Sequence, residues 1–510
     1  MPLLPVLFIF ATLLPIFLGF GLHITGSFRD VQYGLLPLLL YLGYRNRNLP
    51  FTLPRAHRLW IWGGFGCLFV ADSWSRYFAV NLNGIDFSIF DWMLVNTWRG
   101  NFMFSPLNGF SHFAIHPSWI FLPLVPLHAL FMSPFFLLTI GPIILWLPAW
   151  PLWKLCKLKG LSDLDSGLIV LAYLTTPFVD FIVNTGFRIE SFIPLGIFTF
   201  LYFWEKRNTI GWILGALLFF SIKEDSSFYL AAFAIAQLFQ KETRIAAGGL
   251  LAGSLLFTAW TFGIQQPYFL REAQQLEPGY LGFWGHYGAT KEEILKKMIT
   301  SPWLVISDIF RSGWWRLYVP LLLFPLLSLP VLLASLPAIF LLGTAASCSA
   351  MHGYNHYYAC LLLCFALYGM QDFFVRFSHV SRLRGVARGA LFFFPLFHAG
   401  WVSVLRPDWK TFDALQQARH FLEQNHPHAK ICTQTIGFPQ LGYTLALQPY
   451  TESCLTQVDT MIVTIPQKDP HPYSKEMWEN LDEKITKMGG KRFDFGEVKV
   501  YQTPEEQPPN

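Results

Sequence analysis

Apolar residues run in long blocks over residues 3–405, and many blocks approach the roughly 20 residues that a helix needs to cross a bilayer. Proline or glycine interrupts many of them, which membrane helices tolerate. The pattern predicts a mainly α, polytopic transmembrane bundle of about 13 spans. The first block, residues 3–22, lacks a basic flank and a small-residue cleavage site, so we expect a retained membrane helix.

Composition supports this fold class. The chain is 53% hydrophobic and 14% charged, whereas about a quarter of the residues of a typical soluble protein are charged. The net charge of +5 says little by itself, because in a polytopic protein the placement of basic residues matters more than their sum. We therefore expect no nucleic-acid partner.

Basic residues gather in short gaps between apolar blocks, which the positive-inside rule places in the cytoplasm together with the N-terminus. The opposite gaps then face outward, and they carry most of the candidate chemistry. The basic gaps hold Arg45, Arg47, Arg55 and Arg58; Lys154, Lys157 and Lys159; Lys206 and Arg207; Lys241 and Arg244; and Arg376, Arg382, Arg384 and Arg388. The outward gaps are residues 81–116, 184–191, 222–226, 264–318 and 347–355.

One interval does not fit this alternation. Residues 117–153 must contain an odd number of crossings, yet they read as two segments broken at Ser133-Pro134. We expect one of the two to be re-entrant or half-spanning, which proline-rich helices allow when protein surrounds them.

The chain divides into three parts. Residues 1–58 form an N-terminal transmembrane hairpin and a basic loop, residues 59–405 form a transmembrane core with outer loops 81–116 and 264–318, and residues 406–510 form a small soluble α/β domain on the outside. In this last part, DWKTFDALQQARHFLEQN and SKEMWENLDEKITKMGG predict helices, AKICTQ and DTMIVTIP predict strands, and KRFDFGEVKVYQ predicts a hairpin. Cys432 and Cys454 are candidates for a disulfide bond.

The outer stretch NGIDFSIFDWMLVNTWRG holds two carboxylates among aromatic residues. Phe87, Phe90, Leu94 and Trp98 recur at helical spacing, which predicts an amphipathic helix along the membrane surface with Asp86 at its start. Asp91 lies roughly 140° around the axis from Asp86, so the two acids have separate roles. A simple helix cap at Asp86 and a solvated Asp91 are the alternative.

Further charges lie in other short outer gaps. Lys223, Glu224 and Asp225 follow one another between two apolar blocks, where charges are costly and are usually paired or functional. Arg188 and Glu190 occupy another gap and are predicted to reach the same outer cavity. A turn with mutual ion pairs is the alternative for the first cluster, and an interfacial ion pair for the second.

Histidines form two i, i+4 pairs, His112 with His116 and His352 with His356. The spacing suits a helical metal site, but neither pair carries the HExxH glutamate. His112, His116 and His352 are thus weak metal candidates, and ordinary interfacial histidines are the alternative. His356 and Tyr357 are further candidates for substrate binding.

Five segments in this order resemble a family of predicted bacterial membrane proteins of unknown function in the GT-C glycosyltransferase superfamily, alongside protein mannosyltransferases and aminoarabinose transferase-like enzymes. The resemblance covers roughly residues 60–405. Phe90 stands where better-known relatives carry Tyr, and Arg188-Ile189 where the family tends to show His-Pro. The segments are IDFSIFDWMLVNT, SHFAIHPSWIFLPLVPLHALF, FRIESFIPL, IKEDSSFYLA and GYNHYYACLL.

The resemblance implies an inverting transferase in the bacterial inner membrane that moves a sugar from a polyprenyl-phosphate donor to an acceptor hydroxyl at the outer face. Asp86 would be the general base. Lys223 and Arg188, alone or with a divalent cation, would stabilise the departing phosphate. Asp91, Glu190, Glu224 and Asp225 would shape the substrate site. The expected partners are the lipid-linked donor and membrane lipids. A lipid or solute transporter and a non-catalytic scaffold are the alternatives.

Overall fold

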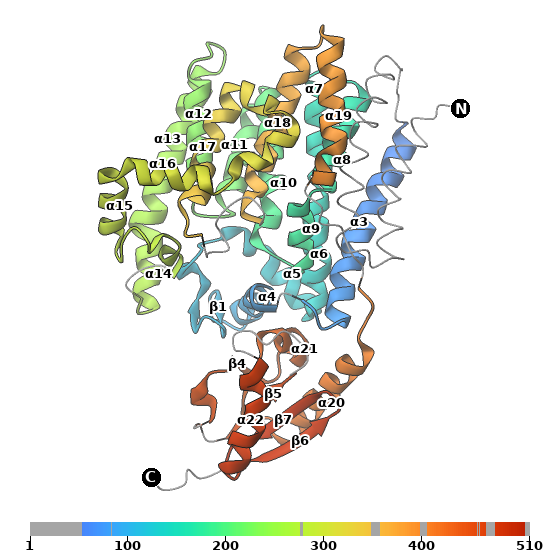
Figure 1. Cartoon of the computed structure of the whole chain (residues 1–510), viewed down its shortest axis with the longest axis vertical. Coiled ribbons are helices and arrows are strands. Elements are labelled where there is room, and N and C mark those ends of the chain that lie inside the picture. The colour runs from blue at the N-terminus through green and yellow to red at the C-terminus, as the bar shows by residue number, and fades with distance from the viewer. Residues whose placement is uncertain are drawn as a thin grey trace.

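The computed structural model describes residues 54–504, except 83, 276–278, 348–356, 398–404, 456, 458 and 466–474. Most of residues 1–58, the predicted N-terminal hairpin, therefore lies outside the described residues. The described chain forms a helical bundle with a separate sheet below it (Figure 1). The bundle helices are α3 (Arg55–Phe78), α4 (Gly84–Trp98), α5 (Leu124–Phe131), α6 (Pro134–Trp146), α7 (Ala149–Leu158), α8 (Asp163–Leu174), α9 (Pro177–Asn184), α10 (Phe192–Glu205), α11 (Thr209–Phe220), α12 (Ser226–Gln237), α13 (Arg244–Trp260), α14 (Gln266–Glu272), α15 (Lys291–Thr300), α16 (Pro302–Arg311), α17 (Leu329–Thr344), α18 (Cys360–Arg376) and α19 (Ser381–Phe397).

Helical hairpins build the centre of the bundle. α10 packs on α11, and α12 packs on both α13 and α17. The α10–α11 contact is close because a Cβ added at Gly215 would lie 2.7 Å from the Cα of Phe200. One large apolar cluster fills the space between the helices. The turns of these hairpins therefore lie at the two ends of the bundle.

Two continuous helical stretches in the described chain are long and apolar enough to cross a membrane, Pro134–Leu158 and Arg244–Glu272. The first comprises α6 and α7, and the second comprises α13, a π-helical turn at Thr261–Gln265, and α14. Shorter apolar helices are Thr209–Phe220, Ser226–Gln237 and Leu329–Thr344.

The irregular interval after residue 117 has a clear structure. α5 has only 8 residues, which give a length of roughly 12 Å against a hydrocarbon core of about 30 Å. It ends at Met132 in the left-handed conformation, and Ser133 then caps α6 by accepting a hydrogen bond from the Phe135 amide. The interval thus contains a short helix followed by one long helical stretch, and the single crossing stays a prediction.

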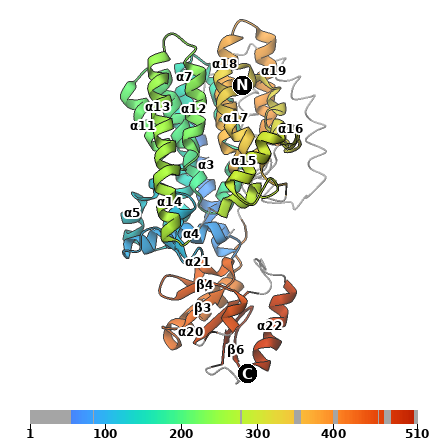
Figure 2. The same cartoon turned by 90° about the vertical axis from the view of Figure 1, so that its left-hand side faces the viewer.

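The C-terminal part is a five-stranded mixed sheet in the order β4-β3-β5-β7-β6. β3 is parallel to β4 and β5, whereas β7 is antiparallel to β5 and β6. α20 and α22 lie on opposite sides of the strands (Figure 2). The elements are α20 (Trp409–Asn425), β3 (Lys430–Thr433), α21 (Phe438–Leu441), β4 (Ala446–Pro449), β5 (Thr460–Thr464), α22 (Lys475–Lys487), β6 (Lys491–Phe495) and β7 (Val498–Gln502).

Alternating strand residues explain these two layers. Ile431 and Val463 pack with Leu415 of α20, whereas Ile462 packs with Leu481 of α22 on the other face. Both predicted helices, both predicted strands and the hairpin are confirmed. The disulfide between Cys432 and Cys454 is also present, with its Cα atoms 6.4 Å apart. It lies on the α22 face of the sheet.

The amphipathic character predicted for residues 87–98 is wrong, although the helix exists. In α4, Phe87, Phe90 and Leu94 are buried as expected, but Asp91, Trp92 and Met93 on other sides of the helix are buried too. The reason is position: α4 lies between the bundle and the C-terminal sheet, in contact with α5 and α21 (Figure 1). Both sides of the helix therefore face protein.

Candidate functional site

Three outer segments that are far apart in sequence meet in one chain of ion pairs. Asp86, in the first turn of α4, lies with Oδ2 2.6 Å from Nη1 of Arg188. Nε of Arg188 lies 3.4 Å from Oε2 of Glu190. Oε1 of Glu190 lies 3.8 Å from Nζ of Lys223. The structure thus joins Asp86, Arg188, Glu190 and Lys223, as the short outer gaps predicted; we call these four residues the charged cluster.

Local structure fixes these charges at one end of the bundle. Arg188 has an extended backbone just before a 3-10 turn, Ile189–Ser191, which leads into α10. Lys223 lies in the tight turn between α11 and α12. Asp225 is the residue before α12, and it accepts a 2.7 Å hydrogen bond from the Tyr229 hydroxyl one helical turn later. The short connections leave Arg188 and Lys223 buried.

Lys223 is a buried ammonium with incomplete partners. Its side chain is 9% exposed, and its nearest carboxylate oxygen is the one at 3.8 Å on Glu190. No hydrogen bond to its Nζ forms within the part of the chain that the structure describes. Burial alone lowers the pKa of Lys223, but the carboxylates of Asp225, Glu190 and Glu224 raise it above its ordinary value. Lys223 is thus held as a cation with donors to spare.

A narrow cavity adjoins Lys223. Glu190, Asp225, Tyr229 and Tyr358 help to line it, and its volume of about 20 Å³ holds little more than one water molecule. The Tyr358 ring lies 5.1 Å from Nζ of Lys223, at cation–π distance. A ligand larger than a water molecule therefore does not fit this cavity unless its lining moves.

Asp86 is more accessible than the rest of the charged cluster. Its side chain is 29% exposed, whereas that of Arg188 is 6% exposed. Arg188 binds Oδ2, and among the described residues nothing pairs with Oδ1. A carboxylate that is oriented through one oxygen and accessible through the other suits a general base.

A histidine and a glutamate that sequence reasoning treated separately form a pair. His116 Nδ1 lies 2.8 Å from Oε1 of Glu224. Burial raises the pKa of Glu224, but His116 and Lys223 together lower it by more. The pKa of Glu224 therefore lies below its ordinary value. At Asp225, burial raises the pKa by more than the charge of Lys223 lowers it, so the pKa of Asp225 lies above its ordinary value. The other oxygen of Glu224, Oε2, is buried and accepts no hydrogen bond from the described part of the chain.

His112 lies beside this pair, with its ring centroid 5.6 Å from that of His116. Burial, helped by His116, lowers its pKa to about 3, so the ring is neutral near pH 7. Nδ1 faces the amide nitrogen of Asn108 at 3.2 Å and therefore accepts, which places the ring proton on Nε2. That Nε2 is buried and has no hydrogen-bond partner among the residues that the structure describes. An unused donor and an unused acceptor thus lie close to the charged cluster.

The histidines do not assemble a metal site in the described chain. No group of three or more His, Cys, Asp or Glu side chains there is arranged to hold a metal ion. His352 and His356 lie outside the described residues. Tyr357 is the first residue of a short 3-10 turn, but the structure does not describe its side chain. The candidate roles of these three residues remain predictions.

Asp91 has a different environment from Asp86, as its position on the helix predicted. It is 1% exposed, with Oδ1 2.9 Å from Nε2 of His128 and Oδ2 accepting a 2.6 Å hydrogen bond from the Tyr443 hydroxyl. His128 belongs to α5, and Tyr443 to the C-terminal part. Both oxygens are occupied, so the geometry favours an anchoring role for Asp91 over the predicted contact with substrate.

Sequence reasoning missed the partners of these acids. The i, i+4 spacing of Asp225 and Tyr229 was a usable signal, because such residues share a helix face. The pairings of His116 with Glu224 and of Tyr443 with Asp91 join segments more than 100 residues apart. No local pattern marks such pairs.

The fold and the site define a helical bundle with a buried, charged site at one end. The chain belongs to the family described as "Predicted membrane protein (DUF2079)", whose model matches residues 76–479. The family resemblance seen in the sequence is thereby confirmed.

A solved structure similar to this chain is titled "Crystal Structure of ArnT from Cupriavidus metallidurans in the apo state". The identity is 11% and the TM-score is 0.47, over 86% of this chain and 98% of that one. No curated protein matches the chain.

Proposed function

We propose that the protein is a membrane glycosyltransferase that moves a sugar from a polyprenyl-phosphate donor to an acceptor hydroxyl. The observation that carries the proposal is the buried ammonium of Lys223, whose Nζ donates no hydrogen bond within the described residues and which is joined through Glu190 and Arg188 to the accessible carboxylate of Asp86. A cation and a base in one partly enclosed site are what transfer from a phosphate leaving group requires.

In the proposed reaction, the acceptor oxygen forms a bond to the anomeric carbon while the bond from that carbon to the phosphate oxygen breaks. Oδ1 of Asp86 takes the proton from the acceptor hydroxyl. The electron pair of the broken bond goes to the phosphate, whose charge Lys223 and Arg188 stabilise. A single displacement of this kind inverts the anomeric centre.

The remaining polar groups would hold the sugar. The unpartnered Nε2–H of His112 is a donor and Oε2 of Glu224 is an acceptor, and a sugar hydroxyl satisfies both types of group. Asp225, held by Tyr229, would complete this wall. Tyr358 would move aside when the donor enters, because the present cavity is too small for a sugar phosphate.

The orientation belongs to the proposal as well. We place the charged cluster and the C-terminal sheet outside the bacterial inner membrane and the basic turns in the cytoplasm, following the positive-inside rule. The sheet would control access to the site or bind the acceptor. A cysteine-accessibility scan tests this orientation: labelling of the Lys223 turn from the cytoplasm would reverse it.

The activity is tested with purified protein and a labelled polyprenyl-phosphate sugar. Wild-type protein should release polyprenyl phosphate, and Asp86→Asn should lower the rate by about 10²–10⁴-fold, the usual worth of a positioned base. Asp413→Asn, at an exposed position on α20, is the matched control. Unimpaired turnover in Asp86→Asn would remove Asp86 from its role, and a scaffold would show no turnover in any variant.

A further inference from the structure

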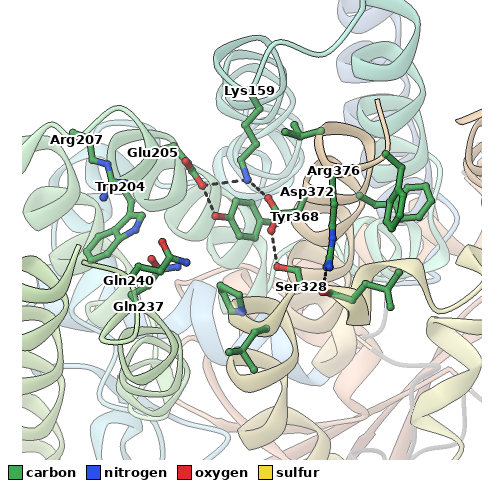
Figure 3. Close-up of a pocket in the computed structure, with 16 residues that line it drawn as sticks. Lys159, Trp204, Glu205, Arg207, Gln237, Gln240, Ser328, Tyr368, Asp372 and Arg376 are labelled. Atoms are coloured by element: carbon green, nitrogen blue, oxygen red, sulfur yellow. Dashed lines mark hydrogen bonds and ion pairs between the residues drawn. The ribbon is translucent and has the colours of Figure 1, made fainter. Parts of the chain in front are cut away.

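A second cavity lies at the opposite end of the bundle from the charged cluster, where α7, α10, α12 and α18 end (Figure 3). α10 shows the separation: Glu190 precedes its first turn and Glu205 is its last residue, and a helix of 14 residues spans roughly 20 Å. The cavity encloses about 510 Å³, within the range of small-molecule sites. It is thus separate from the proposed transferase site.

A fully paired lysine forms one wall of this cavity. Nζ of Lys159 lies 3.1 Å from Oε1 of Glu205, bonds to Oδ1 of Asp372, and lies 3.7 Å from the centre of the Tyr368 ring. Tyr368 in turn donates to Glu205, and Ser328 donates to Asp372. Both oxygens of Asp372 and Oε1 of Glu205 are therefore bonded, and the two acids share Lys159 as their cation.

Two arginines on either side of this wall have no carboxylate partner (Figure 3). Within the described residues, no ion pair involves Arg207 or Arg376, and Arg376 donates only a long 3.4 Å hydrogen bond to the Leu327 carbonyl. The lining holds three cationic side chains, Lys159 and the two arginines, against the two carboxylates that bind Lys159. It therefore carries one excess positive charge. Guanidinium groups bind phosphate oxygens through paired N–H donors, so this arrangement suits an anionic phosphate ester.

The rim shows which source of phosphate the cavity favours. Leu327, Leu329 and Val375 line it, and each is about half exposed. Apolar side chains exposed beside a cationic pocket match a lipid, whose acyl chains lie along the bundle while its headgroup enters the pocket. The same end carries the basic turns, and basic pockets between membrane helices are known sites for anionic headgroups.

We propose that this cavity binds a phosphate ester, with the guanidinium groups of Arg207 and Arg376 attracting the anion from opposite sides and the amides of Gln237 and Gln240 bonding to the polar remainder. The rim favours an anionic phospholipid over a soluble ester. This site does not depend on the proposed transferase activity, because binding is measured without turnover.

Native mass spectrometry on the detergent-purified full-length protein tests the proposal. Phosphatidylglycerol should be retained at least about tenfold more than phosphatidylcholine, and Arg207→Gln and Arg376→Gln should each lower its retention by about tenfold through loss of a charge-assisted contact. Lys206→Gln is the matched control, because Lys206 is an exposed neighbour in the same turn that does not line the cavity. The Lys206→Gln protein should retain as much phosphatidylglycerol as wild-type protein does.

A soluble competitor separates the two sources. If millimolar glycerol 1-phosphate displaces phosphatidylglycerol, the site recognises the phosphate ester itself. If the lipid is retained, the site recognises a lipid-borne ester. Equal retention of both lipids together with no binding of glycerol 1-phosphate would overturn the proposal, as would wild-type retention in both arginine variants. Lipid retention is compared only among variants whose thermal midpoint without ligand equals that of wild type, so that unfolding does not explain a loss. Each arginine variant is a separate test of the site.

Discussion

The two ends of the bundle each bury a lysine against a tyrosine ring, but they differ in how completely the lysine is paired. Both lysine side chains are 9% exposed. Lys159 contacts two carboxylates and a ring centre 3.7 Å away, whereas Lys223 has its nearest carboxylate at 3.8 Å and its ring centre at 5.1 Å. A saturated cation holds helices together, and an unsaturated one is available to a ligand. We therefore expect a structural role for Lys159 and, under the proposed function, a catalytic role for Lys223.

The strongest test of this difference between the two lysines is to remove each cation in turn. Lys223→Gln should lower polyprenyl phosphate release by about 10²–10³-fold, because a preorganised positive charge at the leaving group is lost. Lys159→Gln should leave the rate per folded molecule within about twofold, since it lies outside the site. A similar loss of rate in both variants would show that the two lysines do not differ in role.

The disulfide of the C-terminal part leads to two predictions, one for its stability and one for the compartment that it faces. Cys432 and Cys454 are separated by 22 positions, and opening a loop of this size should lower the free energy of unfolding by about 3 kcal/mol. Thermal unfolding with and without reductant measures this change, with Cys67→Ser as a control for effects on the exposed free thiol. Isolation of the native protein with both thiols free would contradict the orientation.

The structural role of Lys159 predicts a cost to stability. Lys159→Gln leaves Glu205 and Asp372 without their shared cation, and the loss should be about 2 kcal/mol because both carboxylates are partly exposed to solvent. Lys154→Gln, at an exposed position on α7, should change the thermal midpoint very little. An unchanged midpoint in Lys159→Gln would mean that its ion pairs do not hold the helices together.

The smallest effect is expected where the C-terminal sheet meets the bundle. Tyr443→Phe removes the hydrogen bond to the buried Asp91 and should cost about 1 kcal/mol. Limited proteolysis should then cleave the chain faster between the bundle and the sheet. Tyr268→Phe, at an exposed tyrosine of α14, serves as the control. Equal cleavage rates in the two variants would show that Tyr443 does not anchor the sheet.

Local patterns predicted the elements of the C-terminal part, because apolar alternation and helical spacing were clear there. β4 was missed since it has four residues, ends in Pro449 and lies at the edge of the sheet, where proline is tolerated. The meeting of Asp86, Arg188 and Lys223 was also foreseeable, because the positive-inside rule predicted that these short segments lie on one side of the membrane, where their charges would be at one level.

Partners from distant segments could not be predicted in this way. The burial of α4 on all sides depends on a sheet that begins more than 300 residues later, and its own sequence shows only the apolar face that meets the bundle. The same is true of Tyr443 and His128, which look like ordinary interfacial residues until the fold places them on Asp91.

One consequence of α4 concerns motion. Asp86 and Asp91 share this helix, five residues or roughly 7.5 Å apart along its axis. Because the Tyr443 hydroxyl donates a hydrogen bond to Asp91, we expect a tilt of the C-terminal sheet to move α4, and Asp86 with it. Under the proposed function, the distance between Asp86 and the acceptor hydroxyl would then depend partly on how the sheet packs on the bundle.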